Sequence, residues 1–216
     1  MKRKVLGVSQ AVLIAVVILS GAIALPIVFR PFFYWHIEPY HLPETLDLTI
    51  SEIKTAYREM MDFCIGRTHD FSAGVLPFSQ SGAEHFADVQ KLFLLDLWAF
   101  GISSGLLIVL KLLFRKEKLS LAGHTPGFWG AAGLGITGTA VGLLAAMDFE
   151  NAFTVFHTLF FPGKDNWLFD PLTDPIISML PAEFFRNCAI LILAVILLSC
   201  GGLLAWDWHL RRTAKK

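Results

Sequence analysis

Two histidines at the ends of apolar segments are the residues of this sequence best suited to chemistry. His85 stands four residues before the apolar run that begins at Val89, and His157 lies eight residues beyond the run that ends at Phe149. An imidazole titrates near neutral pH, so it can both accept and give a proton in most cells. The pair therefore predicts general acid–base chemistry, provided that the fold brings the two rings together.

Two carboxylates accompany the first histidine. Asp88 is three residues after His85 on the same face of a helix, where it can fix the tautomer and the orientation of the ring. Glu84 precedes His85 directly. In the alternative interpretation, both carboxylates only complement the positive end of a helix dipole and the histidines are ordinary interfacial side chains. The spacing by itself leaves both interpretations open.

Motifs of several other catalytic classes are missing. The sequence contains no HExxH zinc motif, no Walker loop and no CxxC pair, and its three cysteines show no metal-ligand spacing. Ser79, Ser81 and Thr158 are candidate nucleophiles only because they are near the histidines in sequence. We expect no metal and no cofactor, with a zinc site built from the outer histidines as the alternative.

The composition places these residues in a membrane protein. Of 216 residues, 55% are hydrophobic and 17% are charged, and the mean hydropathy is +0.58. A soluble chain of this length cannot bury so much apolar surface. Four runs are long and apolar enough to cross about 30 Å of hydrocarbon. We predict an all-α membrane protein, a four-transmembrane-helix bundle with a small extracellular cap that contains an amphipathic helix.

These runs divide the chain into predicted segments. The spans are 1–29, 89–114, 127–149 and 183–206; the extracellular cap is 30–88 and is completed by the loop 150–182; the cytoplasmic parts are the loop 115–126 and the tail 207–216. A cleaved secretory signal is the alternative for the first span. Its apolar run of about 25 residues exceeds the 7 to 15 that such signals need, which favours a retained anchor.

The charges indicate an orientation. Basic residues gather at one set of span ends, namely Lys2, Arg3, Lys4, Lys111, Arg115, Lys116, Lys118, Arg211, Arg212, Lys215 and Lys216. Most acidic residues lie in the two other connecting segments. The positive-inside rule therefore predicts that both termini are cytoplasmic and that the histidine pair lies at the extracellular membrane interface. A net charge of zero gives no reason to expect a nucleic-acid partner.

The first outer segment contains local folding signals. Thr49 and Glu52 have the spacing of a capping box, and apolar residues then recur at helical intervals until Gly66, which predicts an amphipathic helix. The stretch 32–42 is aromatic and is interrupted by a proline, Pro39, which predicts a short strand or extended chain.

A second capping signature precedes the second span. Ser81 and Glu84 have the capping-box spacing, so we predict a helix that begins near Gly82 and runs without a break to Phe114. At 1.5 Å per residue this helix is longer than the bilayer needs. Its first turns should protrude and carry the titratable cluster around His85 to the level of the lipid headgroups.

The predicted spans contain charged residues, for which we expect partners, and glycines, for which we expect close helix packing. Asp96 and Arg186 lie within apolar runs, where an unpaired charge costs at least about 2.5 kcal/mol. We expect them to pair with each other or with other polar groups, either as a structural ion pair or to bind a polar headgroup. Gly138 and Gly142 form a GxxxG pair, which is typical of close helix packing.

Aromatic residues are dense around His157. Phe153, Phe156 and Trp167 belong to a run of rings in which phenylalanine dominates. An interfacial aromatic belt accounts for many of them, but belts usually favour Trp and Tyr. The alternative is that the phenylalanines wall a dry pocket for acyl chains.

The four-span layout, the long outer segment, the stretch from Glu84 to Val89 and the Phe-rich stretch around His157 together resemble one family. This is the lipoprotein intramolecular transacylase, a membrane family of Gram-positive bacteria that was formerly a domain of unknown function. The resemblance covers essentially the whole chain, although its individual motifs are short.

The resemblance implies a function. A member of this family is an acyltransferase that moves the sn-2 acyl chain of a diacylglyceryl-cysteine lipoprotein to the α-amino group of the same cysteine, giving lyso-form lipoprotein. Its substrates would be diacylated bacterial lipoproteins in contact with membrane lipid. The implied residues are His85 and His157 as catalytic, Asp88 and Glu84 as supporting, and Phe153, Phe156, Trp167, Arg186 and Asp96 as the acyl and substrate pocket. The alternative is a non-enzymatic membrane partner or a lipid-handling subunit.

Overall fold

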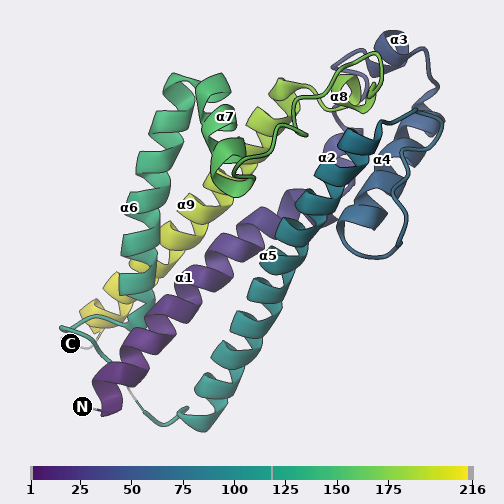
Figure 1. The fold of residues 1–216 in the computed structure, drawn as a ribbon. Coiled ribbons are helices and arrows are strands. Elements are labelled where there is room, and N and C mark those ends of the chain that lie inside the picture. The colour runs from purple at the N-terminus through teal and green to yellow at the C-terminus, as the bar shows by residue number, and fades with distance from the viewer. Residues whose placement is uncertain (1, 118, 214–216) are drawn as a thin grey trace. The chain divides into compact units, whose positions relative to one another are not determined.

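The computed structural model describes residues 2–117 and 119–213, and it is built from helices and connecting turns (Figure 1). The helices are α1 (Lys2–Val28), α2 (Pro31–Tyr34), α3 (Leu42–Leu46), α4 (Ile50–Cys64), α5 (Gln80–Leu113), α6 (Pro126–Met147), α7 (Phe149–Phe160), α8 (Ile176–Met179) and α9 (Ala182–Thr213). No strand forms in the described part of the chain, so the all-α prediction is confirmed. Of the basic clusters, Lys118, Lys215 and Lys216 lie outside the described residues.

Four of these helices, α1, α5, α6 and α9, are long and apolar enough to cross a membrane. Their most apolar stretches have mean hydropathies between 1.5 and 2.8. Helix α5 has 34 residues, or about 50 Å at 1.5 Å per residue, so it is longer than the hydrocarbon layer is thick. The chain is accordingly a multi-pass membrane protein.

The prediction of extended chain over 32–42 is wrong. Pro31 opens the short helix α2, where a proline loses no hydrogen bond because the first helical N–H has no partner in any case. The turns that follow lead into α3, whose N-cap residue His41 has a left-handed φ of 50°. Tertiary packing decides this segment, since the Phe33 ring stacks on Tyr57 of α4 with centroids 3.8 Å apart.

The first of the two capping predictions is confirmed. The Thr49 hydroxyl accepts a hydrogen bond from Glu52 N at 3.3 Å, and the Glu52 carboxylate accepts one from Thr49 N at 2.9 Å. These reciprocal bonds satisfy two of the N–H groups that the first turn of α4 leaves free. They also fix the point at which the amphipathic helix begins.

The second capping prediction is wrong in its residues. Helix α5 begins at Gln80, and the residue that caps it is Ser79, whose hydroxyl accepts from Gly82 N at 2.9 Å. The Ser79 N–H in turn donates to the buried carboxylate of Asp174 at 2.8 Å. Asp174, which is distant in sequence, therefore fixes the residue that caps the start of α5. Glu84 accepts a hydrogen bond from Gln80 at 2.9 Å.

The described helices divide between two compact units. One, here called the membrane unit, comprises Met1–Ala24, Asp96–Leu144 and Ile190–Lys216. The other, here called the cap unit, comprises Leu25–Leu95 and Ala145–Ala189. Both histidines singled out above belong to the cap unit.

Small residues pack the membrane unit. Ala22, Ala131, Ile196 and Cys200 form a buried cluster contributed by α1, α6 and α9. Gly142 lies against Leu193 of α9 so closely that a Cβ at this position would come within 2.5 Å of that side chain. The GxxxG pair thus serves helix packing, as predicted. Many large apolar side chains of this unit point outward, which is the arrangement that lipid requires.

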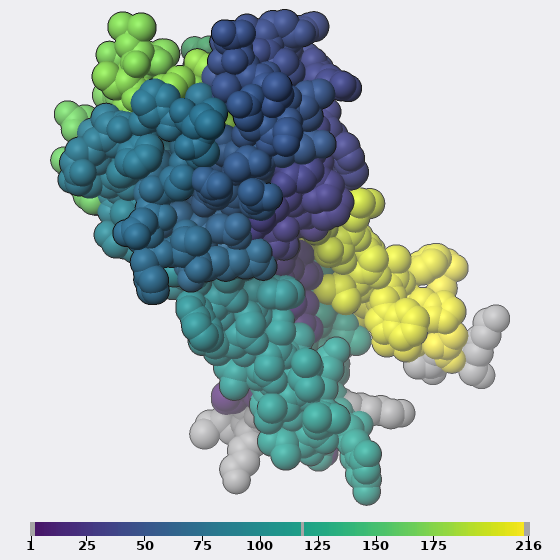
Figure 2. Space-filling view, turned by 90° about the vertical axis from the view of Figure 1, so that its right-hand side faces the viewer, coloured from purple at the N-terminus to yellow at the C-terminus, as the bar shows by residue number. Residues whose placement is uncertain are grey.

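The apolar face of α4 forms the core of the cap unit. Ile53, Ala56 and Tyr57 are almost fully buried. At its edge, the Arg30 guanidinium binds the Asp62 carboxylate and ties the segment before α2 to α4. In the space-filling view, α4 and the residues that follow it, in blue, cover one side of the cap unit (Figure 2). Helix α3 packs beside α8 at another edge of this unit.

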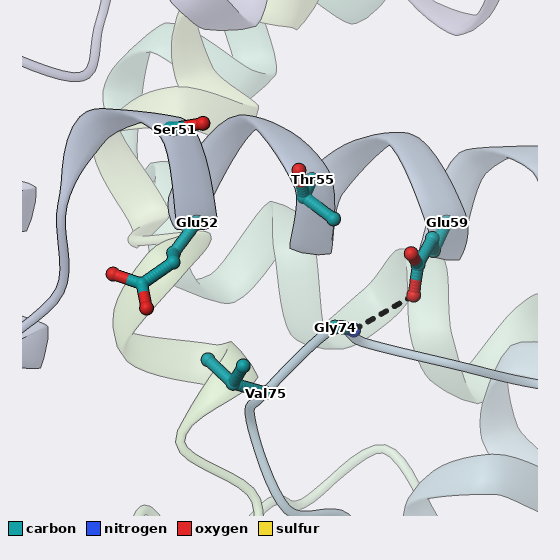
Figure 3. A pocket seen from close by; sticks show the side chains of 6 residues that line it. All are labelled: Ser51, Glu52, Thr55, Glu59, Gly74 and Val75. Atoms are coloured by element: carbon teal, nitrogen blue, oxygen red, sulfur yellow. Dashed lines mark hydrogen bonds between the residues drawn. The ribbon is translucent and has the colours of Figure 1, made fainter.

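A hollow of about 260 Å³ opens beside α4 (Figure 3). Its lining residues are Ser51, Glu52, Thr55, Glu59, Gly74 and Val75. The Glu59 carboxylate already accepts hydrogen bonds from Gly74 N at 3.2 Å and from the Ser72 hydroxyl at 2.7 Å, and Glu52 caps its own helix. Gly74 has a φ of +62° and lies against the Ala56 backbone. The carboxylates of this hollow are thus engaged in holding the loop on α4.

Two glycines of α6 provide a matched test of the packing. A Cβ at Gly130 would lie 2.5 Å from the Ala11 carbonyl oxygen of α1, whereas nothing lies within 4 Å of a Cβ at Gly133. We expect Gly130→Ala to destabilise the protein by about 1 to 3 kcal/mol through overpacking against rigid backbone. Gly133→Ala should be neutral or up to about 1 kcal/mol stabilising, because alanine favours helix. Thermal unfolding in detergent measures both, and equal midpoints would contradict this packing.

Candidate active site

The two histidines meet inside the cap unit. His85 lies in the second turn of α5 and His157 lies on α7, and the side chains are 5% and 7% exposed. Their ring centroids are 5.9 Å apart and the ring planes differ by 29°. The structure thus brings together two imidazoles that are 72 positions apart in the sequence. Each is shielded from water, which strengthens any electrostatic interaction between them and a bound group.

Helix α7 positions the second histidine. The Asp148 side chain caps this helix by accepting a hydrogen bond from Asn151 N at 3.0 Å, directly after α6 ends at Met147. One turn further on, His157 Nδ1 lies 2.8 Å from the Phe153 carbonyl oxygen. A carbonyl oxygen only accepts, so Nδ1 carries the proton and the Nε2 of a neutral ring keeps its lone pair. Helix α7 therefore occupies the first part of the segment 150–182, for which the sequence predicts a loop.

The protonation of His157 follows from its surroundings. Burial lowers the pKa of its imidazole below the usual value, and this effect outweighs the hydrogen bond to Phe153, which acts in the opposite direction. The ring is therefore neutral at pH 7, where its Nε2 is available as a base. A base with a pKa near or below the working pH is the form that general base catalysis needs.

Aromatic rings enclose the pair. Phe161 lies edge-on to His85 with centroids 5.0 Å apart, and 5.7 Å from His157. Phe169 approaches His85 at 5.4 Å, and Trp167 stacks on His157 at 4.7 Å. Walls of this kind exclude water and accept apolar chains. Rings of the Phe-rich stretch therefore surround the two histidines, and that they hold acyl chains stays a prediction.

Asp88 is the ionic centre of the site. One carboxylate oxygen accepts from the Lys91 ammonium at 3.0 Å, and the other from Lys164 at 2.5 Å and from the Asn166 amide nitrogen at 3.3 Å. A hydrogen bond from the His85 ring to the Asp88 carboxylate, which the spacing predicts, is not among those of the described residues. Asp88 instead fastens the segment that follows α7 to α5.

The remaining predicted pocket residues are more scattered. The ring centroids of Phe153 and His157 are 4.2 Å apart. Those of Phe156 and His157 are 5.4 Å apart, and Phe156 is 46% exposed. Arg186 lies in the first turns of α9, in the cap unit, and Asp96 belongs to the membrane unit. Neither takes part in an ion pair within the described part of the chain, so their expected pairing is not found.

Two of the three candidate nucleophiles, Ser79 and Thr158, have structural roles. The Ser79 hydroxyl caps α5, and the Thr158 hydroxyl bonds to carbonyl oxygens of its own helix. Residues 101–105 read Gly-Ile-Ser-Ser-Gly, which matches the GxSxG pattern of a serine-hydrolase elbow. They lie within continuous helix α5, however, and that elbow requires a sharp turn between a strand and a helix. None of these residues forms an activated nucleophile.

Lys164 and Asn166 were missed by the sequence analysis. Lys164 did leave a signal, because it is the only lysine or arginine in the otherwise acidic segment 150–182. Asn166 left none, since a single asparagine in a connecting segment is unremarkable. Both become visible only when the segment after α7 is folded against α5.

Fold and site together define a helical membrane protein with a buried, aromatic-walled histidine pair suited to proton transfer. The family model of the lipoprotein intramolecular transacylase Lit matches residues 8–185. The chain belongs to this family, and it is accordingly an acyltransferase.

Solved structures agree with this assignment. The chain is similar to the membrane-integral lipoprotein intramolecular transacylase Lit from Bacillus cereus, with a TM-score of 0.89 and 26% identity over 99% of this chain and 98% of that one. Two further structures of the Bacillus cereus protein, in which a histidine is replaced by arginine or by alanine, match with TM-scores of 0.81 and 0.80. No curated protein sequence matches the chain.

Proposed function

We propose that this protein transfers the sn-2 acyl chain of a diacylglyceryl-modified N-terminal cysteine to the amino nitrogen of the same cysteine, which leaves a lyso-form lipoprotein. Family membership supports the reaction class. The observation that carries the assignment of the site is the convergence of the buried His85 and His157 rings, whose centroids are 5.9 Å apart, among aromatic side chains. These two residues are the proposed catalytic pair, and Asp88 and Glu84 support the helix that carries one of them.

The two imidazoles have complementary tasks in this reaction. The cysteine ammonium first loses one proton to solvent, and one imidazole accepts a second proton from the nitrogen as the neutral amine attacks the ester carbonyl. The other gives a proton to the departing secondary alkoxide, so that the C–O bond breaks as the amide forms. The nitrogen and oxygen involved are attached to one carbon, and each hydrogen bond is about 2.8 Å long. Rings 5.9 Å apart can therefore serve the same tetrahedral centre.

The tether within the substrate sets the main difficulty. From the amino nitrogen, the ring of the transition state runs through Cα, Cβ, sulfur, two glyceryl carbons, the ester oxygen and the acyl carbon, which makes it eight-membered. Such medium rings are strained and rarely sampled. The main contribution of the enzyme to the rate is therefore to hold the amine against the carbonyl. Rigid walls such as Phe161 and Trp167 suit this task, and no acyl-enzyme is needed.

The amphipathic helix α7 supports a location at the extracellular membrane interface. It begins directly after the membrane-spanning helix α6, with only Asp148 between them. One side exposes Val155, Phe156, Leu159 and Phe160, while Glu150, Thr154 and Thr158 lie on another. A helix of this kind rests with its apolar side in the acyl layer. Acyl chains anchored in the bilayer would then reach His157 from the membrane.

Replacing either histidine tests the proposed pair. We expect His85→Ala and His157→Ala each to lower kcat on a diacylated lipopeptide by roughly 100-fold to 10,000-fold, the usual contribution of general acid or base help. His69→Ala, which removes an exposed histidine of the cap unit, is the matched control and should keep full activity. Mass spectrometry follows the product, which keeps its mass but fragments differently. Near-wild-type turnover of either variant would remove it from the mechanism.

A crossover experiment tests the intramolecular route. The enzyme receives two lipopeptides together, one with isotopically heavy acyl chains and one with a heavy peptide. Transfer within one molecule predicts products that carry either label but never both, because no acyl group leaves its own lipopeptide. Doubly labelled products would instead require an acyl-enzyme intermediate and exclude the cyclic transition state.

The orientation is tested by labelling. Thr68 is exposed on the cap unit, so a Thr68→Cys variant should react in intact cells with a thiol reagent that does not cross the membrane. Cys64, which is buried, and the other native cysteines report the background in the unchanged chain. Labelling of the variant only after the membrane is breached would reverse the proposed topology, with both termini then outside.

A further inference from the structure

Two polar atoms beside the histidine pair are buried without a hydrogen-bond partner among the described residues. They are Nδ1 of His85 and Oδ1 of Asn166. The Asn166 side chain lies near the His85 ring, although the two residues form no hydrogen bond with each other in this structure. Unpaired buried groups of this kind are costly, so two of them side by side, one a ring nitrogen and one an amide oxygen, call for a functional reason.

The orientation of the Asn166 amide follows from Asp88. The two lysine ammoniums bound to Asp88 stabilise its carboxylate as an anion, and an anionic carboxylate only accepts hydrogen bonds. The Asn166 group that faces Asp88, at 3.3 Å, is therefore the NH2 group. The amide oxygen consequently points away from Asp88 and can only accept a hydrogen bond from the atom it meets.

We infer that Asn166 is a positioning residue, whose amide oxygen accepts a hydrogen bond from His85 Nδ1–H in the reacting complex and so makes Nε2 the working atom of that ring. This inference rests on the proposed function. Asn166, and not Asp88 as the spacing predicts, then fixes the tautomer of His85. Asp88 acts indirectly, because it orients the Asn166 amide. Hydrogen bonds of catalytic groups are commonly long before substrate binds and tighten in the complex.

In this arrangement both imidazoles have the same tautomer, with the proton on Nδ1. His157 Nδ1 is held by the Phe153 carbonyl and His85 Nδ1 by the Asn166 amide, so each ring presents Nε2 to the substrate, whether as base or as acid. Asn166 does not itself touch the reacting atoms. The charged and titratable groups that face His85 are Asp88 of its own helix, His157 of α7 and Lys164 of the following segment.

The test combines activity with the tautomer of the ring. NMR of the full-length protein with isotope-labelled histidines, assigned with His85→Gln, should show the proton of neutral His85 on Nδ1. Asn166→Ala should lower kcat roughly 10-fold with little change in KM, and should shift the ring toward the Nε2–H tautomer. Asn166→Asp keeps an acceptor oxygen, so it should retain the Nδ1–H tautomer. Its negative charge should move the limb of the kcat/KM pH profile that His85 controls to higher pH, because an anion favours the imidazolium.

Several results would overturn the inference. Asn151→Ala, which changes an exposed asparagine of α7, is the control and should leave both readouts unchanged. The inference fails if Asn166→Ala keeps kcat within twofold of the wild type, or lowers kcat while His85 stays in the Nδ1–H form. If that variant does not fold, a proton on Nε2 in the wild-type ring is sufficient to reject it. A wild-type protein that makes no lyso-form product would refute the proposed function instead, and the tautomer measurement is independent of that outcome.

Discussion

The ionic cluster around Asp88 holds the site together. Its carboxylate binds Lys91 on its own helix and Lys164 and Asn166 on the segment that follows α7. The Lys91 and Lys164 side chains are 74% and 47% exposed, so solvent screens both ion pairs and each contributes about 1 kcal/mol at most. Because three donors from two segments converge on one carboxylate, they attach these segments to each other together. Trp167 and Phe169, which wall the histidine pair, lie in the segment that this cluster fixes.

The start of α5 is fixed in a comparable way. Asp174 accepts the Ser79 N–H, and Ser79 caps the first turn of the helix that carries His85 six residues later. Both devices use a carboxylate from one part of the chain to satisfy donors in another. Because such bonds are strong and directional, they position the His85 ring more accurately than apolar contacts alone would. Precise placement matters here, since proton transfer requires hydrogen-bond distance on both sides of one carbon.

The chemistry makes modest demands on reactive groups and large demands on geometry. The attacking nitrogen and the ester belong to one molecule, so the protein supplies neither a nucleophile nor a carrier. What it supplies is a dry, rigid space and two imidazoles with defined tautomers. Burial keeps His157 neutral and able to accept a proton, and the carbonyl of Phe153 fixes which nitrogen does so. Two histidines in an aromatic pocket are sufficient for this task.

Much of the protein could be predicted from sequence because the signals concerned are local. The apolar runs depend only on residue type, and they indicated four membrane-spanning helices, which α1, α5, α6 and α9 match. The capping box of α4 involves residues three positions apart, and the glycines of α6 have one plausible role inside a span. The two histidines stood out by their positions at the ends of these runs, and a family resemblance of the whole chain supported them.

Other features were decided by tertiary structure. The stretch 32–42 is helical and turned because Phe33 stacks on Tyr57, a contact that its own sequence does not reveal. The capping residue of α5 was misassigned because Asp174, which holds it, is 95 positions from Ser79. Asp88 binds two lysines and an amide instead of His85, and two of those three groups come from a distant segment. Sequence spacing ranks partners within one helix, whereas the free energy of a buried carboxylate depends on every donor that the fold brings to it.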